Sequence, residues 1–285
     1  MGLEKYQQLE KEYAKFTSSL YAVSCNSGTA ALHLALKAAG IGQGDEVIIP
    51  EFTMIACAFA VSYCGATPVF IDCGEDLNID VKLIKNKITT QTKAIMPVHI
   101  YGRLCDMKAI HKIAKKHKLF IIEDACEAQG AVKHSKADIT CYSFYKNKII
   151  HAEEGGMCTT NNEYLAEKIK RLKNMSFTEE HNYIHPEIGF NYRMPNSQAK
   201  LALKSLHNYK KEKKRRSELV KKYDKMFGKT PKRDANWVYD MPKKKVNGLK
   251  TREFFKPMSM QPPYLGEYKN LNAYKKSKEG MLIML

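Results

Sequence analysis

The first 160 residues alternate between helix-like and strand-like patterns of apolar positions. Residues 30–40, AALHLALKAAG, place three leucines among alanines, and Gly40 stands where a helix commonly ends. The pattern therefore predicts a helix there, and it predicts others at 53–65 and 107–117. Short apolar runs predict strands at 47–50, 67–73, 92–99, 119–124 and 139–145.

Strands that alternate with helices are typical of βαβ units, so we expect an α/β fold with a mostly parallel central sheet flanked by helices. Ligands of such sheets bind beyond the carboxyl ends of the strands. That rule selects four places in this chain: the turn at 27–29, Asp124, the segment that begins at Ser143, and the loop after residue 99.

The pattern changes after residue 195. Residues 196–227 predict one long basic helix, which Gly228 and Pro231 would end. The rest is rich in lysine and proline, with weak periodicity, and it predicts a small, loop-rich domain. We therefore expect a large domain at 1–205, followed at 206–285 by the long basic helix and the small C-terminal domain.

Composition and charge narrow the class of protein. With 285 residues, of which 44% are hydrophobic, the chain has a globular composition. It has no apolar run near the ~18 residues of a membrane span and no apolar signal core at its start, so we expect a cytoplasmic protein without a membrane segment. Its eight cysteines show no C-x-x-C pair and no zinc-ligand spacing, which favours reduced core thiols and predicts no metal site.

The net charge of +17 lies mostly at the C-terminal end, because residues 201–285 hold 23 Lys and Arg against 8 Asp and Glu. Such runs are usually solvated helix faces, although they also attract anionic partners. The chain shows no helix-turn-helix, zinc-finger or RNP motif, so nucleic acid is not a favoured partner.

Three of the strand-end segments carry candidate chemistry. Ser27, Gly28 and Thr29 open a predicted helix, whose free N–H groups and positive end suit a phosphate, although Ser and Thr are also ordinary N-caps. Glu123 and Asp124 end an apolar strand, where a carboxylate contacts a protonated ring nitrogen, a metal or a ribose, or simply caps the next turn. There is no G-x-G-x-x-G turn for a dinucleotide.

The third segment is SFYKNK, with a hydroxyl at Ser143 and amines at Lys146 and Lys148. A lysine at the ligand edge of a sheet is suited to Schiff-base chemistry, but the pattern alone does not choose between the two lysines. A phosphate site, an acid for a pyridinium nitrogen and a lysine for an imine are together what pyridoxal 5'-phosphate requires.

The chain resembles the DegT/StrS family of pyridoxal-phosphate sugar aminotransferases of fold type I. The resemblance covers about residues 10–215, with a weaker match in TREFFKPMSMQPPY at 251–264. Its matching stretches, in the family's order, are NSGTAALHLAL, GDEVIIP, PVFIDC, TKAIMPVHIYG, IIEDACEAQGA, SFYKNK, EGGM and GFNYRMPNSQA. It implies a small C-terminal α+β domain, here shortened relative to the family.

The resemblance assigns roles to individual residues. The cofactor lysine follows the phosphate-binding serine by five places, which implies Lys148 after Ser143 and makes Lys146 a bystander. Asp124 matches the partner of the ring nitrogen, and Gly28 and Thr29 match the phosphate cradle. Asn191 matches an asparagine that reaches the cofactor phosphate of the neighbouring subunit, which implies a homodimer with shared active sites.

Other positions depart from the commonest pattern of the family. Met54 stands where a residue stacks on the pyridine ring, and Glu127 where a glutamine often contacts the ring hydroxyl. His185 and Arg193 are expected to meet an anionic substrate. Glu153 replaces a glycine, which predicts a strained turn if that position needs a positive φ.

The resemblance implies an aminotransferase that moves an amino group from glutamate to a nucleotide-linked 4-keto-6-deoxy sugar, closest in look to perosamine-synthase-like members. The alternative is a catalytically impaired pyridoxal-phosphate-binding relative that acts as a regulator or binds an anionic ligand. The change at Glu153 and the basic C-terminal region keep that alternative open.

Overall fold

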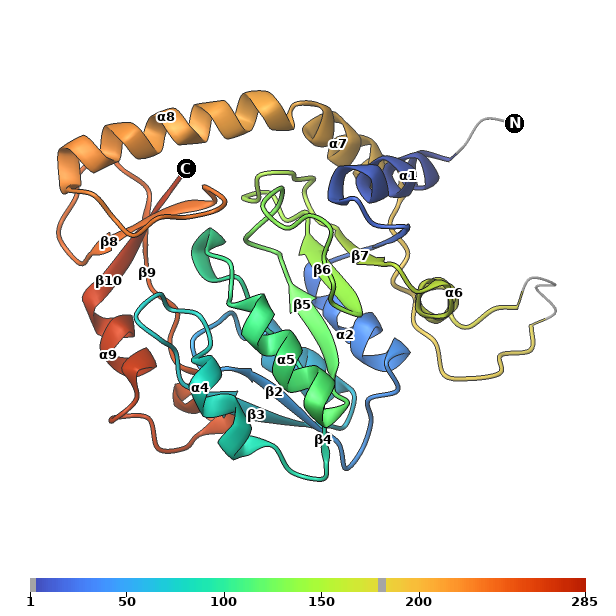
Figure 1. Cartoon of the computed structure of the whole chain (residues 1–285). Coiled ribbons are helices and arrows are strands. Elements are labelled where there is room, and N and C mark those ends of the chain that lie inside the picture. Colours follow the sequence, from blue (N-terminus) through green and yellow to red (C-terminus); the bar gives the residue numbers. More distant parts are fainter. Residues whose placement is uncertain (1–3, 179–182) are drawn as a thin grey trace.

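A computed structural model describes residues 4–178 and 183–285 of the chain (Figure 1). Its main sheet has seven strands in the order β1-β7-β6-β5-β4-β2-β3. The strands are β1 (Tyr21–Cys25), β2 (Glu46–Pro50), β3 (Thr67–Ile71), β4 (Thr92–Ile95), β5 (Phe120–Asp124), β6 (Ile139–Ser143) and β7 (Gly156–Thr160). Pairs from β3 through to β6 are parallel, and β7 is antiparallel to both of its neighbours. The predicted mostly parallel α/β sheet is confirmed.

Helices cover both faces of this sheet. Ile48, Ile95 and Ile121 pack with Ile110 and other residues of α5 on one face, whereas alternate residues of the same strands pack toward α2 and α3 on the other. Burial on both faces accounts for the continuous apolar runs of these strands. The helices are α1 (Lys5–Thr17), α2 (Gly28–Ala38), α3 (Ala56–Tyr63), α4 (Val81–Ile84), α5 (Met107–His117) and α6 (Glu163–Lys173).

The C-terminal residues build a second, antiparallel sheet in the order β8-β10-β9. It consists of β8 (Val238–Pro242), β9 (Thr251–Glu253) and β10 (Gly280–Met284), and α9 (Asn272–Glu279) leads directly into β10. The small α+β part that the resemblance implied is therefore present. The boundary between residues 205 and 206 stays a prediction.

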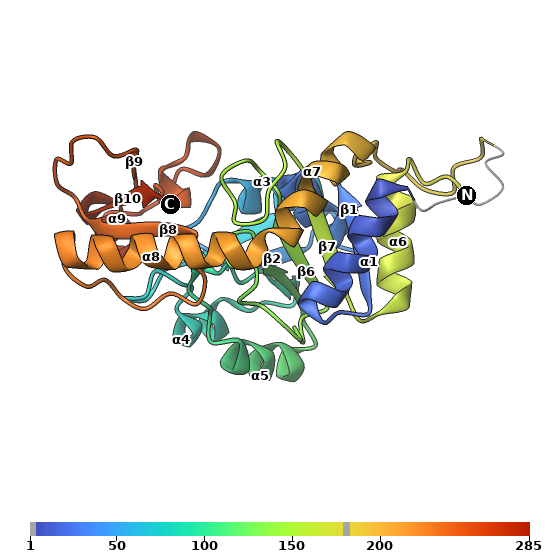
Figure 2. The same ribbon diagram turned by 90° about the horizontal axis from the view of Figure 1, so that it is seen from above.

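The expected single helix at 196–227 is wrong in one respect, because two helices occupy these residues. Helix α7 (Asn196–His207) ends and α8 (Tyr209–Phe227) begins at Asn208, a residue type that disfavours helix interiors. Leu203 and Leu206 of α7 pack with the core near α1, whereas Tyr223 of α8 packs with the C-terminal sheet. The break lets each helix pack on its own core. Figure 2 shows α7 next to α1, and α8 running on toward the C-terminal sheet.

The structure bears on two further expectations from composition. In the two described ranges, no helix is both long and apolar enough to cross a membrane. All eight cysteines are free thiols, and all but Cys126 are buried, as core thiols should be.

Candidate active site

The structure brings seven of the predicted site residues to one cavity of about 370 Å³. The cavity lies where β5 and β6 end and where α2 begins, which is the edge that the rule for α/β sheets selects. Its lining includes Gly28, Thr29, Met54, Asp124, Glu127, Ser143 and Lys148. Met54 is 48% exposed, so its thioether is open to a ligand in the cavity.

The first turn of α2 forms one end of the cavity. The Ser27 hydroxyl caps the helix by accepting from the Ala30 N–H at 3.1 Å, while the N–H groups of Gly28 and Thr29 have no partner within the helix. A Cβ on Gly28 would lie 2.7 Å from the Ser143 Cβ, so only glycine lets the helix start approach the end of β6 this closely. The helix end, the two free amides and the Ser143 hydroxyl together fit a phosphate group.

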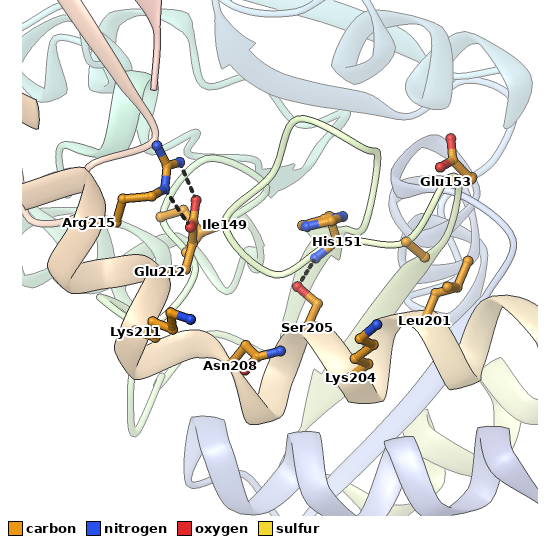
Figure 3. A pocket seen from close by; sticks show the side chains of 11 residues that line it. Ile149, His151, Glu153, Leu201, Lys204, Ser205, Asn208, Lys211, Glu212 and Arg215 are labelled. Carbon is orange, nitrogen blue, oxygen red and sulfur yellow. Dashed lines mark hydrogen bonds and ion pairs between the residues drawn. The ribbon is translucent and has the colours of Figure 1, made fainter.

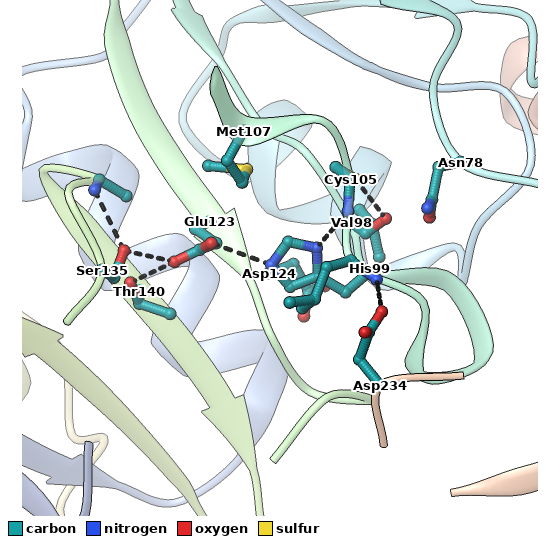
Figure 4. A network of polar contacts seen from close by, with 12 residues as sticks. Asn78, Val98, His99, Cys105, Met107, Glu123, Asp124, Ser135, Thr140 and Asp234 are labelled. Atoms are coloured by element: carbon teal, nitrogen blue, oxygen red, sulfur yellow. Dashed lines mark hydrogen bonds and ion pairs between the residues drawn. The ribbon is translucent and has the colours of Figure 1, made fainter. Parts of the chain in front are cut away.

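The two acids at the end of β5 face opposite sides of the sheet. The Glu123 carboxylate is taken up internally: it accepts from His99 Nε2 at 2.9 Å and from the hydroxyls of Ser135 and Thr140 at 2.6 and 2.7 Å (Figure 4). Burial raises the pKa of Glu123, but these hydrogen bonds outweigh burial and hold the pKa below its ordinary value. Asp124, as the alternate residue of the strand, faces the cavity instead.

Asp124 is only 5% exposed in the wall of the cavity and is held in place from two sides. Its Oδ1 accepts from the Cys126 N–H at 2.9 Å, and its Oδ2 accepts from the Cys57 thiol at 3.3 Å. Burial, and then the nearby Asp124 carboxylate, raise the pKa of Cys57 well above its ordinary value, so the thiol keeps its proton and acts as the donor. Asp124 has lone pairs left for a protonated nitrogen.

The structure also separates the two lysines. Lys148 is 9% exposed, and its Nζ lies 3.9 Å from the ring centroid of Trp237, the one tryptophan of the chain. Lys146 is exposed, and its amine lies over the Tyr145 ring at the surface. The amine that lines the cavity is therefore that of Lys148.

A buried glutamine holds both ends of the segment that carries Lys148. Gln129 Nε2 donates to the carbonyl oxygens of Ser143 and Ile150, each at 2.9 Å, and its Oε1 accepts from the Ile150 N–H at 2.7 Å. Gln129 is 1% exposed. The sequence does not indicate this residue, because nothing in the pattern joins position 129 to positions 143 and 150.

Glu127 is a buried acid whose pKa lies near neutral pH. Burial raises its pKa to about 7, even though the charge of Lys148 and the Tyr101 N–H, which donates to Oε2 at 2.8 Å, act in the opposite direction. A carboxyl with this pKa is protonated in a sizeable fraction of molecules at neutral pH. It then donates a hydrogen bond, as a glutamine in its place would.

Glu153 does not strain its turn. Its φ is not positive, so its backbone does not need a glycine. The residue of this turn with a positive φ is Gly155, at +147°. Glu153 lines a different cavity, at the junction of α7 and α8, together with Lys204 and Lys211 (Figure 3). A glutamate at position 153 therefore does not disturb the cavity that Lys148 lines.

Three predicted residues lie away from the cavity of their own chain. Asn191 is exposed and forms a β-bridge with Asn174. Arg193 Nη1 donates to Asn174 Oδ1 at 2.8 Å, and the His185 ring contacts the Met175 carbonyl oxygen. Their assignment to a neighbouring subunit or to the substrate stays a prediction.

Residues in and next to the C-terminal sheet also line the cavity, although no site role was predicted for them. Trp237, Arg252 and Phe255 all line it, about 90 to 110 positions after Lys148 in the chain. The Trp237 indole N–H donates to the Asn147 carbonyl oxygen at 3.1 Å, which ties this wall to the lysine segment. Arg252 and Phe255 belong to the stretch 251–264 that resembles the family, whereas Trp237 lies outside it.

The residues of the cavity fit pyridoxal phosphate. Gly28, whose missing Cβ leaves the helix start open, lies with Ser143 at the phosphate end, and Asp124 and Lys148 supply a buried carboxylate and a buried amine. When bound, the pyridine ring of this cofactor draws electrons from the carbon that carries the amine, which makes its proton acidic. This fold with this pocket defines the class of fold-type-I pyridoxal-phosphate enzymes.

Comparison with known proteins makes the assignment more specific. Residues 2–245 match the DegT/DnrJ/EryC1/StrS aminotransferase family, so the chain belongs to that family. The GDP-perosamine synthase of Caulobacter vibrioides is 40% identical over 90% of this chain and 78% of its own length. The GDP-perosamine synthase of Escherichia coli O157:H7 is 44% identical over 70% of this chain, but only 57% of that enzyme is covered.

Solved structures agree with the family. DesV of S. venezuelae, in complex with a ketimine intermediate, superposes with a TM-score of 0.91 at 30% identity, over 100% of this chain and 84% of DesV. DesI, in the presence of its TDP-sugar product, gives a TM-score of 0.90 at 25% identity, over 100% of this chain and 80% of DesI. The fold-type-I prediction is confirmed.

Proposed function

We propose that the protein transfers an amino group from glutamate to the ketone of a nucleotide-linked 4-keto-6-deoxy sugar. The observation that carries this proposal is the meeting of a buried amine, Lys148, and a buried carboxylate, Asp124, in a cavity with a helix-start phosphate site. The GDP-perosamine synthases among the relatives support an amino sugar as the product.

The residues take separate parts in this proposal. Gly28, Thr29 and Ser143 bind the cofactor phosphate, and Asp124 holds the charge of the ring nitrogen through ion pairing. Lys148 holds the cofactor. Its amine would then move a proton between a carbon atom of the bound substrate and a carbon atom of the cofactor. Glu127 contacts the ring hydroxyl. A second copy of the chain would bring Asn191 to the phosphate and complete the site of a homodimer.

Two relatives have names that state a sugar position, and both names state position 3, whereas the name GDP-perosamine synthase states none. A relative from Acidithiobacillus ferrooxidans, 43% identical over 67% of this chain, is named as a 3-aminotransferase of a UDP-linked sugar. The proposed C4 position therefore rests on the likeness to the perosamine synthases, which cover more of the chain. UDP, GDP and dTDP carriers are all within the proposal.

The test has two stages. Cofactor-loaded protein is first mixed with glutamate, and we expect the absorbance of the bound cofactor to change as 2-oxoglutarate forms. UDP-, GDP- and dTDP-linked 4-keto-6-deoxy sugars are then offered one by one, and the product is identified by mass. An amino sugar from one carrier supports the proposal, and no amino sugar from any carrier, with the first stage complete, overturns the proposed acceptor.

The impaired relative remains the second candidate, because a relative from Geobacillus stearothermophilus, 40% identical over 68% of this chain, is named a pleiotropic regulatory protein. The first stage separates the two candidates. A cofactor spectrum that persists in excess glutamate favours the regulator, whereas its conversion favours the enzyme.

A further inference from the structure

The cavity contains one arginine, Arg252, that has no part in the proposed binding of the cofactor. Arg252 lies on β9, the edge strand of the C-terminal sheet, and lines the cavity opposite the residues of the main sheet. Its side chain is exposed, so it does not belong to the hydrophobic core. Core packing therefore does not account for an arginine at this position.

Aromatic rings hold the Arg252 guanidinium near the reactive amine. Its Cζ lies 4.9 Å from the ring centroid of Phe255 and 5.9 Å from that of Trp237. Because Lys148 Nζ lies 3.9 Å from the same Trp237 centroid, the guanidinium carbon and the amine are no further apart than the sum of the two distances, 9.8 Å. A small acid or a sugar phosphate spans such a gap.

The charges of the cavity indicate the same role. The cavity wall carries three acids, Asp124, Glu127 and Glu154, and its cations are Lys148 and Arg252. Among the residues that the structure describes, Arg252 has no carboxylate within ion-pair distance, while its neighbour Glu253 is paired with Lys243 and Lys256. An anionic substrate that enters beside three acids needs a cation to offset their charge. The proposed function assigns Lys148 to the cofactor, which leaves Arg252 for the substrate.

We propose that Arg252 binds the anionic group of the substrate that reacts at Lys148. The guanidinium fork matches two oxygen atoms of a carboxylate or of a phosphate, so one chemistry serves two sources: a carboxylate of the amino-acid donor and the diphosphate of the nucleotide sugar. This inference rests on the proposed function and specifies how its substrates are recognised.

The test is equilibrium binding by calorimetry to cofactor-loaded protein, with two kinds of unreactive probe. Succinate represents the donor, and GDP, UDP and dTDP represent the acceptor. We expect Arg252→Gln to weaken at least one probe tenfold or more, because hydrogen bonds to charged groups carry that much affinity. Arg252→Lys, which keeps the charge without the fork, should recover part of the loss.

Lys250→Gln is the matched control, because it removes the same charge two residues away and outside the cavity lining. Loss of succinate binding in Arg252→Gln assigns the arginine to the donor, and loss of nucleotide binding assigns it to the acceptor. Binding of every probe within twofold of wild type in Arg252→Gln, or no binding of any probe by wild type, overturns the inference. The cofactor spectrum tests Lys148 separately, so failure of one proposal is distinguishable from failure of the other.

Discussion

Replacement of Gln129 tests whether hydrogen bonding positions the lysine segment. Gln129→Met keeps the length of the side chain but removes all three bonds to the Ser143 and Ile150 backbone. These bonds are buried, so the two carbonyl groups and the N–H lose partners that water cannot readily replace. At about 1 kcal/mol for each bond, the free energy of unfolding should fall by about 3 kcal/mol.

Urea unfolding of the protein without cofactor measures this loss, and a cofactor titration measures its effect on the site. We expect weaker cofactor binding as well, because the same segment carries Lys148. Gln91→Met is the control, since Gln91 is exposed and its side chain makes no hydrogen bond among the described residues. A loss of less than ~1 kcal/mol in Gln129→Met would refute the reasoning, because exposed substitutions alone cost up to ~0.5 kcal/mol.

Two further predictions concern the ends of the cavity. Gly28→Ala puts a Cβ 2.7 Å from the Ser143 Cβ, and overpacking of this kind costs about 1–3 kcal/mol, so cofactor affinity should fall tenfold or more in a fluorescence titration. Gly42→Ala, where the new Cβ meets nothing within 4 Å, should bind the cofactor as wild type does. For Glu127, a pKa of about 7 in the folded protein against 4.5 normally means that the folded state binds more protons than the unfolded chain between these values. The free energy of unfolding should therefore fall as the pH rises through this window, and Glu127→Gln should remove up to about 3 kcal/mol of that dependence between pH 5 and pH 8. Parallel pH profiles of the two proteins would show that Glu127 titrates normally.

The apolar pattern predicted five of the seven strands of the main sheet. Continuous apolar runs identified β2 to β6, because short runs of this kind are typical of strands covered by helices on both sides. Strands β1 and β7 were not predicted, since YAVSC and GMCTT hold few aliphatic residues and no apolar run of strand length. Their place in the sheet depends on long-range pairing, as between Cys25 and Gly156, which no local pattern records.

For the candidate site, too, local patterns predicted some residues, whereas residues that depend on long-range contacts were missed. Asp124, at a strand end, was predictable because fold and chemistry both point to that position, whereas only the resemblance to the family chose Lys148 over Lys146. Gln129, Trp237 and Arg252 were not predicted as site residues, because each acts across a tertiary contact between segments far apart in the chain. The strain expected at Glu153 rested on a glycine in related chains, and the backbone here places its unusual φ at Gly155 instead.

The most direct test of the central claim is to trap the cofactor on its lysine. Protein loaded with pyridoxal phosphate is reduced with borohydride, digested and mapped by peptide mass. We predict that the added cofactor mass lies on Lys148, in wild type and in Lys146→Ala alike, and that Lys148→Ala carries none in this segment. Cofactor mass on Lys146, or none in the 143–150 segment of wild type, would contradict the assignment of Lys148 as the cofactor lysine.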